Sequence, residues 1–177
     1  MKFLFVAAVE FELAVARSLR PGGDDVFLCT GMGPAATREA LDAAFAAGHF
    51  DLAVDLGIAG SYDPARFPVG CVTQVVAEYF GARPGPTLRN PAPPAVFDAL
   101  PKAVGNTVPA LDERYRGVAA DVESMEGAAF FEACLAAGVP FAEIRAISNA
   151  VGESDRSRWN VPLALENLKK ALTLLTI

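Results

Sequence analysis

Residues 122–151 read VESMEGAAFFEACLAAGVPFAEIRAISNAV. Between about residues 124 and 137 the small and aromatic apolar residues follow a helical spacing, so we expect a helix there. A strand over 118–122 is predicted before it, and Val139-Pro140 opens a second strand over 141–148. Strand, helix and strand in succession are typical of an α/β fold.

The same alternation extends towards both ends of the chain. Further strands are predicted over 2–9, 25–30, 52–56, 69–78 and 103–108, and further helices over about 10–19, 35–47 and 161–175. A Gly-rich turn over 57–61 and loops over 81–101 and 152–158 separate them. We therefore expect one three-layer α/β/α domain, residues 1–177, around a mixed, largely parallel central sheet.

Composition restricts the class of protein. A chain of 177 residues with 53% hydrophobic and 20% charged residues is suited to one packed globule rather than a disordered or fibrous protein. A net charge of −6 gives no reason to bind nucleic acid or a membrane surface. No apolar stretch approaches the ~20 residues of a membrane helix, and Met1-Lys2 leads into a strand, so we expect a cytoplasmic protein without a signal peptide.

The cysteines and the histidine limit the chemistry. Cys29, Cys71 and Cys134 are far apart and lie among apolar neighbours, which favours reduced core thiols over disulfides or a metal cluster. His49 alone cannot build a zinc site or a histidine-based triad. We expect no metal and no cofactor, and chemistry carried by carboxylates, amides or hydroxyls.

Polar groups follow the ends of several predicted strands, where open α/β sheets bind ligands. They are Glu10 and Glu12, residues 57–61, Glu123 to Glu126, and Ser148-Asn149. Each has a structural explanation, since acidic residues favour helix starts and glycines permit tight turns. The three carboxylates within 121–127 border an apolar helix face, however, and burying them is costly without a ligand or partner.

Four segments together resemble one superfamily. VESMEGAAFFEACLAAGVPFAEIRAISNAV (122–151) is similar to the signature of the purine nucleoside phosphorylase and methylthioadenosine nucleosidase superfamily. Its SMEGAAF part is most similar to futalosine hydrolases. AAVEFELAVA (7–16) resembles the first strand with its catalytic glutamate, and TGMGPAATREAL (30–41) and DLGIAGSYDP (55–64) resemble Gly-rich ligand loops. The resemblance implies a nucleoside phosphorylase-like fold, here shortened between about residues 83 and 120.

The resemblance also implies roles for the acidic residues. Cleavage of a purine nucleoside leaves an oxocarbenium-like ribose that a carboxylate stabilises. Glu126 matches the residue that binds the 2′ and 3′ hydroxyls, and Met125 packs against the sugar. Glu12 matches the general base that deprotonates water. Further substrate-binding residues implied by position are Ser124, Gly31, Gly33, Gly60, Ser148 and Thr107.

Asn149 departs from the adenine-cleaving members, which have an aspartic acid there. An amide cannot donate a proton as a general acid, but it can pair with O6 and N7–H of a 6-oxopurine. We therefore expect a 6-oxopurine base, with adenine as the alternative if the amide is flipped. Glu10 and Glu12 follow the first strand, where a phosphorylase would need groups that bind an anion, so we expect water as the nucleophile. The resemblance implies futalosine as the specific case, giving dehypoxanthine futalosine and hypoxanthine.

The remaining site features stay open. Candidates for binding the 5′ group of the substrate are Arg156, Arg158 and Trp159, or Phe80 and Arg83, and candidates for stacking on the base are Thr107, Leu111 and Tyr115. A phosphate-dependent phosphorylase is the main alternative, because Arg17, Arg20 or Arg38 could hold the anion. A relative that binds purines without cleaving them is another. The superfamily implies a homo-oligomer, a dimer or larger.

Overall fold

The computed structural model describes residues 1–20, 23–81, 87–110 and 119–176, and these residues form one eight-stranded mixed sheet between helices. The strands are β1 (Phe3–Ala7), β2 (Val26–Cys29), β3 (Leu52–Ser61), β4 (Val72–Phe80), β5 (Leu88–Arg89), β6 (Lys102–Thr107), β7 (Val122–Ser124) and β8 (Phe141–Ala150). The helices are α1 (Glu10–Leu19), α2 (Pro34–Ala47), α3 (Gly127–Ala137) and α4 (Val161–Leu172), with short 3₁₀ segments at Ala95–Phe97, Arg156–Arg158 and Thr173–Thr176.

The sheet is parallel in its first half and closes on itself in its second. β2, β1, β3 and β8 lie side by side and run in parallel. β8 then pairs with β4 antiparallel, β4 with β6, β6 with β7, and β7 returns to β3. This ring of pairings brings the ends of β3, β7 and β8 to one place.

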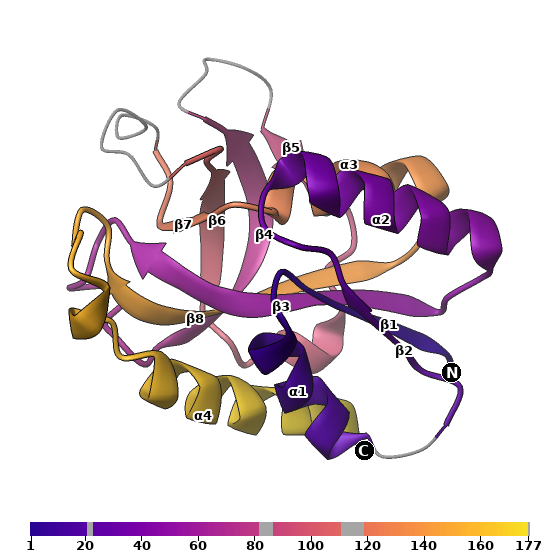
Figure 1. The fold of residues 1–177 in the computed structure, drawn as a ribbon, viewed down its shortest axis with the longest axis horizontal. Helices are drawn as coiled ribbons and strands as arrows, with labels where there is room; N and C mark the ends of the chain where they lie inside the picture. Colours follow the sequence, from indigo (N-terminus) through magenta and orange to yellow (C-terminus); the bar gives the residue numbers. More distant parts are fainter. Residues whose placement is uncertain (21–22, 82–86, 111–118, 177) are drawn as a thin grey trace.

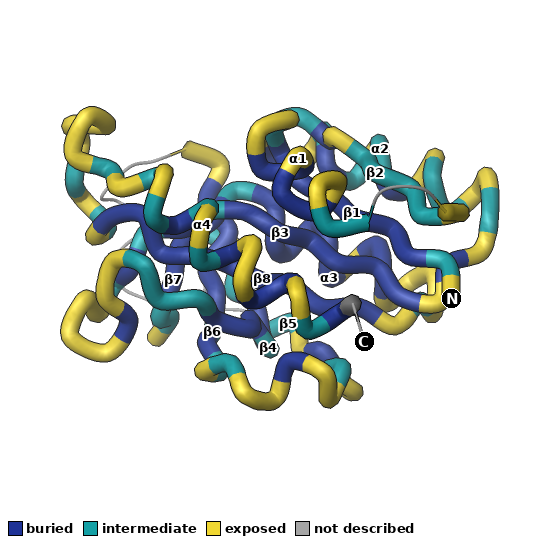
Figure 2. Tube along the Cα trace, turned by 90° about the horizontal axis from the view of Figure 1, so that it is seen from below, coloured by how far each residue is buried: buried dark blue, intermediate teal, exposed yellow. Residues whose placement is uncertain are grey.

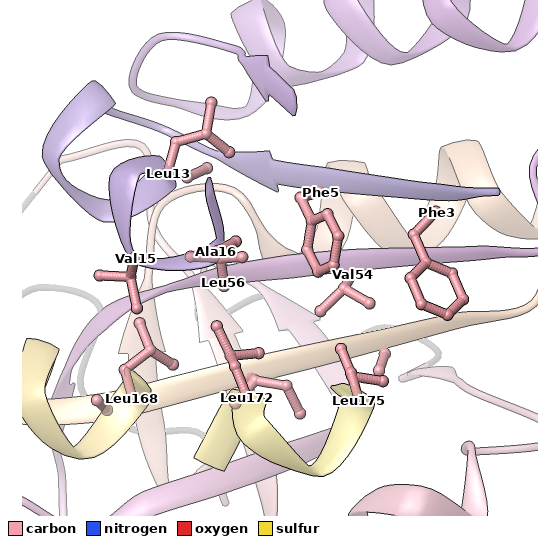
Figure 3. Close-up of a cluster of buried hydrophobic side chains, with 14 of the residues drawn as sticks. Phe3, Phe5, Leu13, Val15, Ala16, Val54, Leu56, Leu168, Leu172 and Leu175 are labelled. Atoms are coloured by element: carbon pink, nitrogen blue, oxygen red, sulfur yellow. The ribbon is translucent and has the colours of Figure 1, made fainter. Parts of the chain in front are cut away.

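Helices cover both faces of the sheet (Figure 1): α2 and α3 lie on one side, and α1 and α4 on the other. Leu168 and Leu172 of α4 point toward Val54 and Leu56 of β3, and Phe5 of β1 joins them (Figure 3). A second cluster, which includes Phe130, Phe131 and Phe141 in edge-to-face contact, lies on the α3 side. The predicted three-layer arrangement is confirmed.

Burial follows these layers (Figure 2). Apart from β2 and β5, the strands are buried along most of their length, whereas the helices expose their outer faces. β1 is buried at every position, as expected of a strand covered on both faces. Among the described residues, no helix has the length and apolar character needed to cross a bilayer.

One sequence prediction about this sheet was wrong. Residues 57–61 were expected to form a Gly-rich turn, but they continue β3, which pairs with β8 up to Ser61 and with β7 at Gly60. Pairing on both sides supplies the hydrogen bonds that a turn would otherwise make, and glycine in a strand often marks close approach of another group. The strand predicted over 118–122 is found as β7, displaced toward the C-terminus, and residue 118 lies outside the described residues.

The helix predicted from Ser124 begins at Gly127 instead. Ser124 belongs to β7, and its hydroxyl accepts a hydrogen bond from the amide of Gly127 (3.4 Å). The Thr107 hydroxyl accepts one from the amide of Ala128 (2.6 Å). Side chains from β7 and β6 therefore satisfy amides of the first turn of α3 that have no partner within the helix.

Candidate active site

A pocket of about 250 Å³ opens near the ends of β1, β7 and β8. The segment after β1, the last part of β3, residues 123–126 and Ser148-Asn149 of β8 all contribute to its wall. Met32, Arg156 and Trp159 complete it. The four polar segments identified from sequence therefore meet at one cavity, whose size lies near the lower end of the ~300–1,000 Å³ common for small-molecule sites.

Glu12 lies in the first turn of α1 and is almost entirely buried, although it lines the pocket. Val9 is extended, and its carbonyl accepts hydrogen bonds from the amides of Glu12 and Leu13 (both 3.2 Å), which starts the helix directly after β1. Oε1 of Glu12 accepts a hydrogen bond from the Ile58 amide (2.9 Å). Among the residues that the structure describes, Oε2 has no hydrogen-bond partner.

Burial raises the pKa of Glu12, because the charged carboxylate loses its water. The Ile58 amide and the positive charge of Arg145 act in the opposite sense, and the negative charge of Glu126 adds to the rise. A carboxyl group with one free oxygen and a raised pKa has the properties of a general base.

Glu126 lies on the same pocket, immediately before α3. Its Oε1 accepts a hydrogen bond from the Gly33 amide (3.0 Å), and its Oε2 accepts one from the Met125 amide (3.2 Å). Gly33 has φ of 93°, a left-handed conformation that strains residues with a side chain. The Gly-rich loop thus fixes Glu126 through its backbone.

Ser148 and Asn149 reach the pocket from the end of β8. The Ser148 hydroxyl donates a hydrogen bond to Oδ1 of Asn149 (2.7 Å), and Nδ2 of Asn149 donates to the Ala150 carbonyl (2.9 Å). These two bonds fix the orientation of the amide. They leave one N–H and one lone pair of the carbonyl for a ligand.

The structure brings most of the sequence-predicted site residues together. Glu12, Gly60, Ser124, Met125, Glu126, Ser148 and Asn149 line the pocket. Gly31 and Gly33 do not line it, and Gly33 instead holds Glu126. Thr107 is fully buried outside the pocket, where its hydroxyl donates to Glu78 and accepts from Ala128. Thr107 therefore has a structural position rather than the predicted contact with the base.

The stacking candidates Leu111 and Tyr115, and the 5′-group candidate Arg83, lie outside the described residues. Within the described part of the chain, no cluster of three or more His, Cys, Asp or Glu side chains is arranged to hold a metal ion. Cys29, Cys71 and Cys134 are free thiols in separate places, with Cys29 exposed.

Several known proteins have sequences similar to this chain. Residues 101–176 match the Phosphorylase superfamily. Over 198 aligned residues the chain is 32% identical to a futalosine hydrolase of Thermus thermophilus, covering 95% of this chain and 88% of that protein. The chain belongs to the futalosine hydrolase family. A futalosine hydrolase of Streptomyces coelicolor is 37% identical over 107 residues, which cover 60% of this chain and 41% of that protein.

Solved structures show the same fold at lower sequence identity. A futalosine hydrolase of Helicobacter pylori superposes with a TM-score of 0.83 at 14% identity, covering 99% of this chain and 97% of that one. A methylthioadenosine/S-adenosylhomocysteine nucleosidase of Colwellia psychrerythraea gives 0.76 at 20% identity, covering 97% and 96%. Membership of the futalosine hydrolase family makes this chain a nucleosidase, an enzyme that hydrolyses N-glycosidic bonds.

Arg145, which sequence reasoning missed, is the largest fully buried side chain of this futalosine hydrolase family member. Its guanidinium forms ion pairs with Asp55 of β3 and Glu143 of β8. A Cβ atom on Gly57 would lie 2.6 Å from Nη1 of Arg145 and 2.9 Å from Oε1 of Glu12. The guanidinium and the carboxylate therefore approach the same backbone atom, and only glycine permits it. The sequence could have indicated Arg145, because a charged residue within a predicted buried strand requires a partner.

Arg156 and Trp159 line the pocket from the segment before α4. The Arg156 guanidinium lies over the indole of Trp159, 5.7 Å from its ring centroid. Arg158, the neighbouring candidate, does not line the pocket and instead pairs with Glu153 and Asp155. Phe80, the other candidate within the described residues, is also outside the lining.

The arginines considered for phosphate binding are directed elsewhere. Arg17 pairs with Glu10, Arg20 with Asp25, and Arg38 with Asp42 and Glu132. None of the three lines the pocket. Their placement agrees with the hydrolytic chemistry of the futalosine hydrolase family, in which water is the nucleophile.

Proposed function

We propose that this chain hydrolyses the N-glycosidic bond of futalosine, releasing hypoxanthine and leaving dehypoxanthine futalosine. One observation carries the proposal: Glu12 and Glu126, from distant parts of the chain, line a single pocket together with Asn149. Similarity to the Thermus thermophilus futalosine hydrolase over nearly the whole chain supports the choice of substrate.

In the proposed mechanism, Glu12 binds the attacking water and accepts its proton. Oε1 is held by the Ile58 amide, which leaves Oε2 to orient the water. Burial raises the pKa of Glu12 and so increases its basicity, and the nearby positive charge of Arg145 opposes that rise.

Glu126 is proposed to bind the ribose. Each of its oxygens accepts a hydrogen bond from one backbone amide, that of Gly33 or that of Met125. Each oxygen retains a lone pair for the 2′ or the 3′ hydroxyl. Its negative charge also stabilises the positive charge that develops on the sugar as the base departs. Met125, which lines the pocket beside it, supplies an apolar contact for the ribose.

Asn149 is proposed to recognise the departing 6-oxopurine. Its free N–H donates to O6, and its carbonyl accepts from N7–H as negative charge develops on the base. The Ser148 hydroxyl fixes the amide in the required orientation.

Arg156 and Trp159 are proposed to bind the aromatic carboxylic acid on the 5′ side of futalosine. A guanidinium over an indole offers a charge for the carboxylate and an apolar surface for the ring. Replacing Arg156 with Gln is expected to lower kcat/KM for futalosine about tenfold, equivalent to ~1.4 kcal/mol, and to leave inosine turnover unchanged. Arg158→Gln is the matched control, since Arg158 does not line the pocket. Equal losses on both substrates would remove this assignment.

The primary test is incubation of the purified protein with futalosine in phosphate-free buffer, followed by chromatography of the products. Hypoxanthine and dehypoxanthine futalosine are the expected products. Failure to release hypoxanthine, or a strict requirement for phosphate, would reject the proposed reaction.

We further propose that the protein works in the cytoplasm as a homo-oligomer. Light scattering of the purified protein measures its oligomeric state.

A further inference from the structure

Two acidic side chains that the proposed mechanism does not use lie fully buried behind the pocket. Glu78 of β4 and Glu143 of β8 are both fully buried, and an oxygen of each lies close to Gly127. A Cβ atom on Gly127, the first residue of α3, would lie 2.5 Å from Oε1 of Glu78 and 2.8 Å from Oε1 of Glu143. We call these two residues the buried carboxyl pair.

A hydrogen bond between two carboxyl groups requires a proton, and the surroundings assign it to Glu78. Nε of Arg145 donates to Oε1 of Glu143 (2.7 Å) and favours its charged form, against the effect of burial, which raises the pKa of Glu143. Among the described residues, the hydrogen bond that Glu78 accepts comes from the neutral hydroxyl of Thr107 (2.8 Å). Burial, and then the charge of Glu143, raise the pKa of Glu78 well above its ordinary value. Among the described residues, Oε1 of Glu78 and Oε2 of Glu143 otherwise lack partners, and one proton satisfies both.

The buried carboxyl pair is linked to Glu12 through Arg145. Glu143 and Asp55 fix the guanidinium from two sides, and its third nitrogen, Nη1, lies near Gly57, as does Oε1 of Glu12. The charged groups that face Arg145 are thus Glu12 on α1, Asp55 on β3, Glu143 on β8 and Glu126 before α3, with Glu78 on β4 facing Glu143.

We propose that Glu78 is a positioning residue of the active site: as a neutral acid it donates to Glu143 and thereby fixes the Arg145 guanidinium beside the general base Glu12. The effect of Glu78 on catalysis rests on the proposed function, in which Glu12 is the general base. A neutral acid is needed because a second anion would compete for Arg145 and weaken its hold on Glu143.

Glu78→Gln tests the charge of the residue. The amide donates to Glu143 from Nε2 and accepts from Thr107 at Oε1, so it reproduces both hydrogen bonds without a titrating group. We expect kcat/KM for futalosine within about threefold of wild type and an acid limb of the pH profile at the same pH. If Glu78 were an anion, its removal would lower the pKa of Glu12 and move the acid limb to lower pH, which would overturn the proposal.

Glu78→Leu tests the hydrogen bond. Loss of the donor frees Glu143 and Arg145, and we expect kcat to fall about tenfold or more with little change in KM. The matched control is Gln74→Leu, also a buried polar residue of β4, which is expected to change stability but not kcat. Wild-type kcat in a folded Glu78→Leu protein would reject a positioning role. If that variant does not fold, the Glu78→Gln profile still tests whether Glu78 is neutral, and a shifted acid limb still overturns the proposal.

Failure of the proposed function is distinguishable from failure of this inference. If the wild-type protein hydrolyses no nucleoside, the infrared spectrum tests the buried carboxyl pair without turnover. A protonated carboxylic acid has a carbonyl band separate from that of carboxylates, and we expect this band at neutral pH in wild type and its loss in Glu78→Gln. An unchanged band in the variant would show that the proton is not on Glu78.

Discussion

We expect turnover to depend most on Glu12, because one of its oxygens is held by the Ile58 amide and the other has no partner among the described residues. We expect Glu12→Gln to lower kcat by about 10²–10⁴-fold, because an amide keeps the hydrogen bond from Ile58 but cannot accept a proton. Glu10→Gln is the matched control, two residues earlier, exposed and paired with Arg17. Steady-state kinetics with futalosine measure both variants. Near-normal activity of Glu12→Gln would assign the base elsewhere.

The pH dependence of the reaction follows from the raised pKa of Glu12. A general base works only when ionised, so activity falls as the pH drops through its pKa. Because burial raises that pKa, we expect the acid limb of kcat/KM above the ordinary glutamate value of about 4.3. Profiles of kcat/KM against pH, recorded in buffers of constant ionic strength, give the midpoint of the acid limb. A midpoint below the ordinary value would mean that the amide of Ile58 and Arg145 outweigh burial.

We propose that Asn149 sets the preference for the base. Asn149→Asp replaces the N–H donor with an acceptor, so O6 of hypoxanthine loses its partner while N7 of adenine gains a proton donor when the acid is protonated. We expect slower release of hypoxanthine from futalosine, by about tenfold or more, and new activity on adenine nucleosides at low pH. Competition between the two kinds of nucleoside in one assay provides the ratio, and an unaltered ratio would remove Asn149 from base recognition.

The sequence could identify a site residue when the evidence for it lay in the residue's own segment of the chain. Glu12, Glu126 and Asn149 each follow or end a strand, where ligand sites gather, and lie in segments that resemble a known family. Arg145 was not identified because its importance depends on Asp55 and Glu143, which only folding brings to it. Thr107 was misplaced because its capping of α3 involves an amide 21 residues away.

At the scale of elements, β3 shows how a strand can contribute to a site through its backbone. Gly57 lies where Arg145 and Glu12 approach each other, and a methyl group there would displace one of them. We expect Gly57→Ala to reduce kcat by at least about tenfold, since misplacement of about 1 Å can cost ~10²-fold. Gly48→Ala is the control, as its added Cβ would meet only Nζ of Lys2 at 3.5 Å.

The outcome for β3 also explains an error of sequence reading. The glycines at 57 and 60 suggested a turn, because glycine permits unusual backbone conformations. Here Gly57 instead removes a side chain from a crowded strand, and β7 and β8 pair with both edges of β3. Pairing between distant strands is not encoded within five residues, so the turn and the crowded strand have the same local sequence signal.

For the whole molecule, the layers were predictable because they depend on repeated local patterns. Alternating strands and helices gave the three-layer arrangement, which is confirmed. The closure of β3, β7, β6, β4 and β8 into a ring was not predicted, since it follows from long-range pairing. The buried carboxyl pair lies on β4 and β8, two strands of this ring, so the unpredicted pairing also determines where these two charges lie.

The buried carboxyl pair should also make global stability depend on pH. We propose that Glu78 is neutral in the folded state and ionises in the unfolded state above its ordinary pKa, so unfolding then releases a proton. Its contribution to stability is complete below that ordinary value and is lost as the pH rises toward the raised pKa of the folded state. The neutral side chain of Glu78→Gln removes that dependence. Urea unfolding between pH 5.5 and 7.5 should therefore show the variant gaining stability relative to wild type as the pH rises, by at most ~1.4 kcal/mol per pH unit. A constant difference would mean that Glu78 is already ionised in the folded protein.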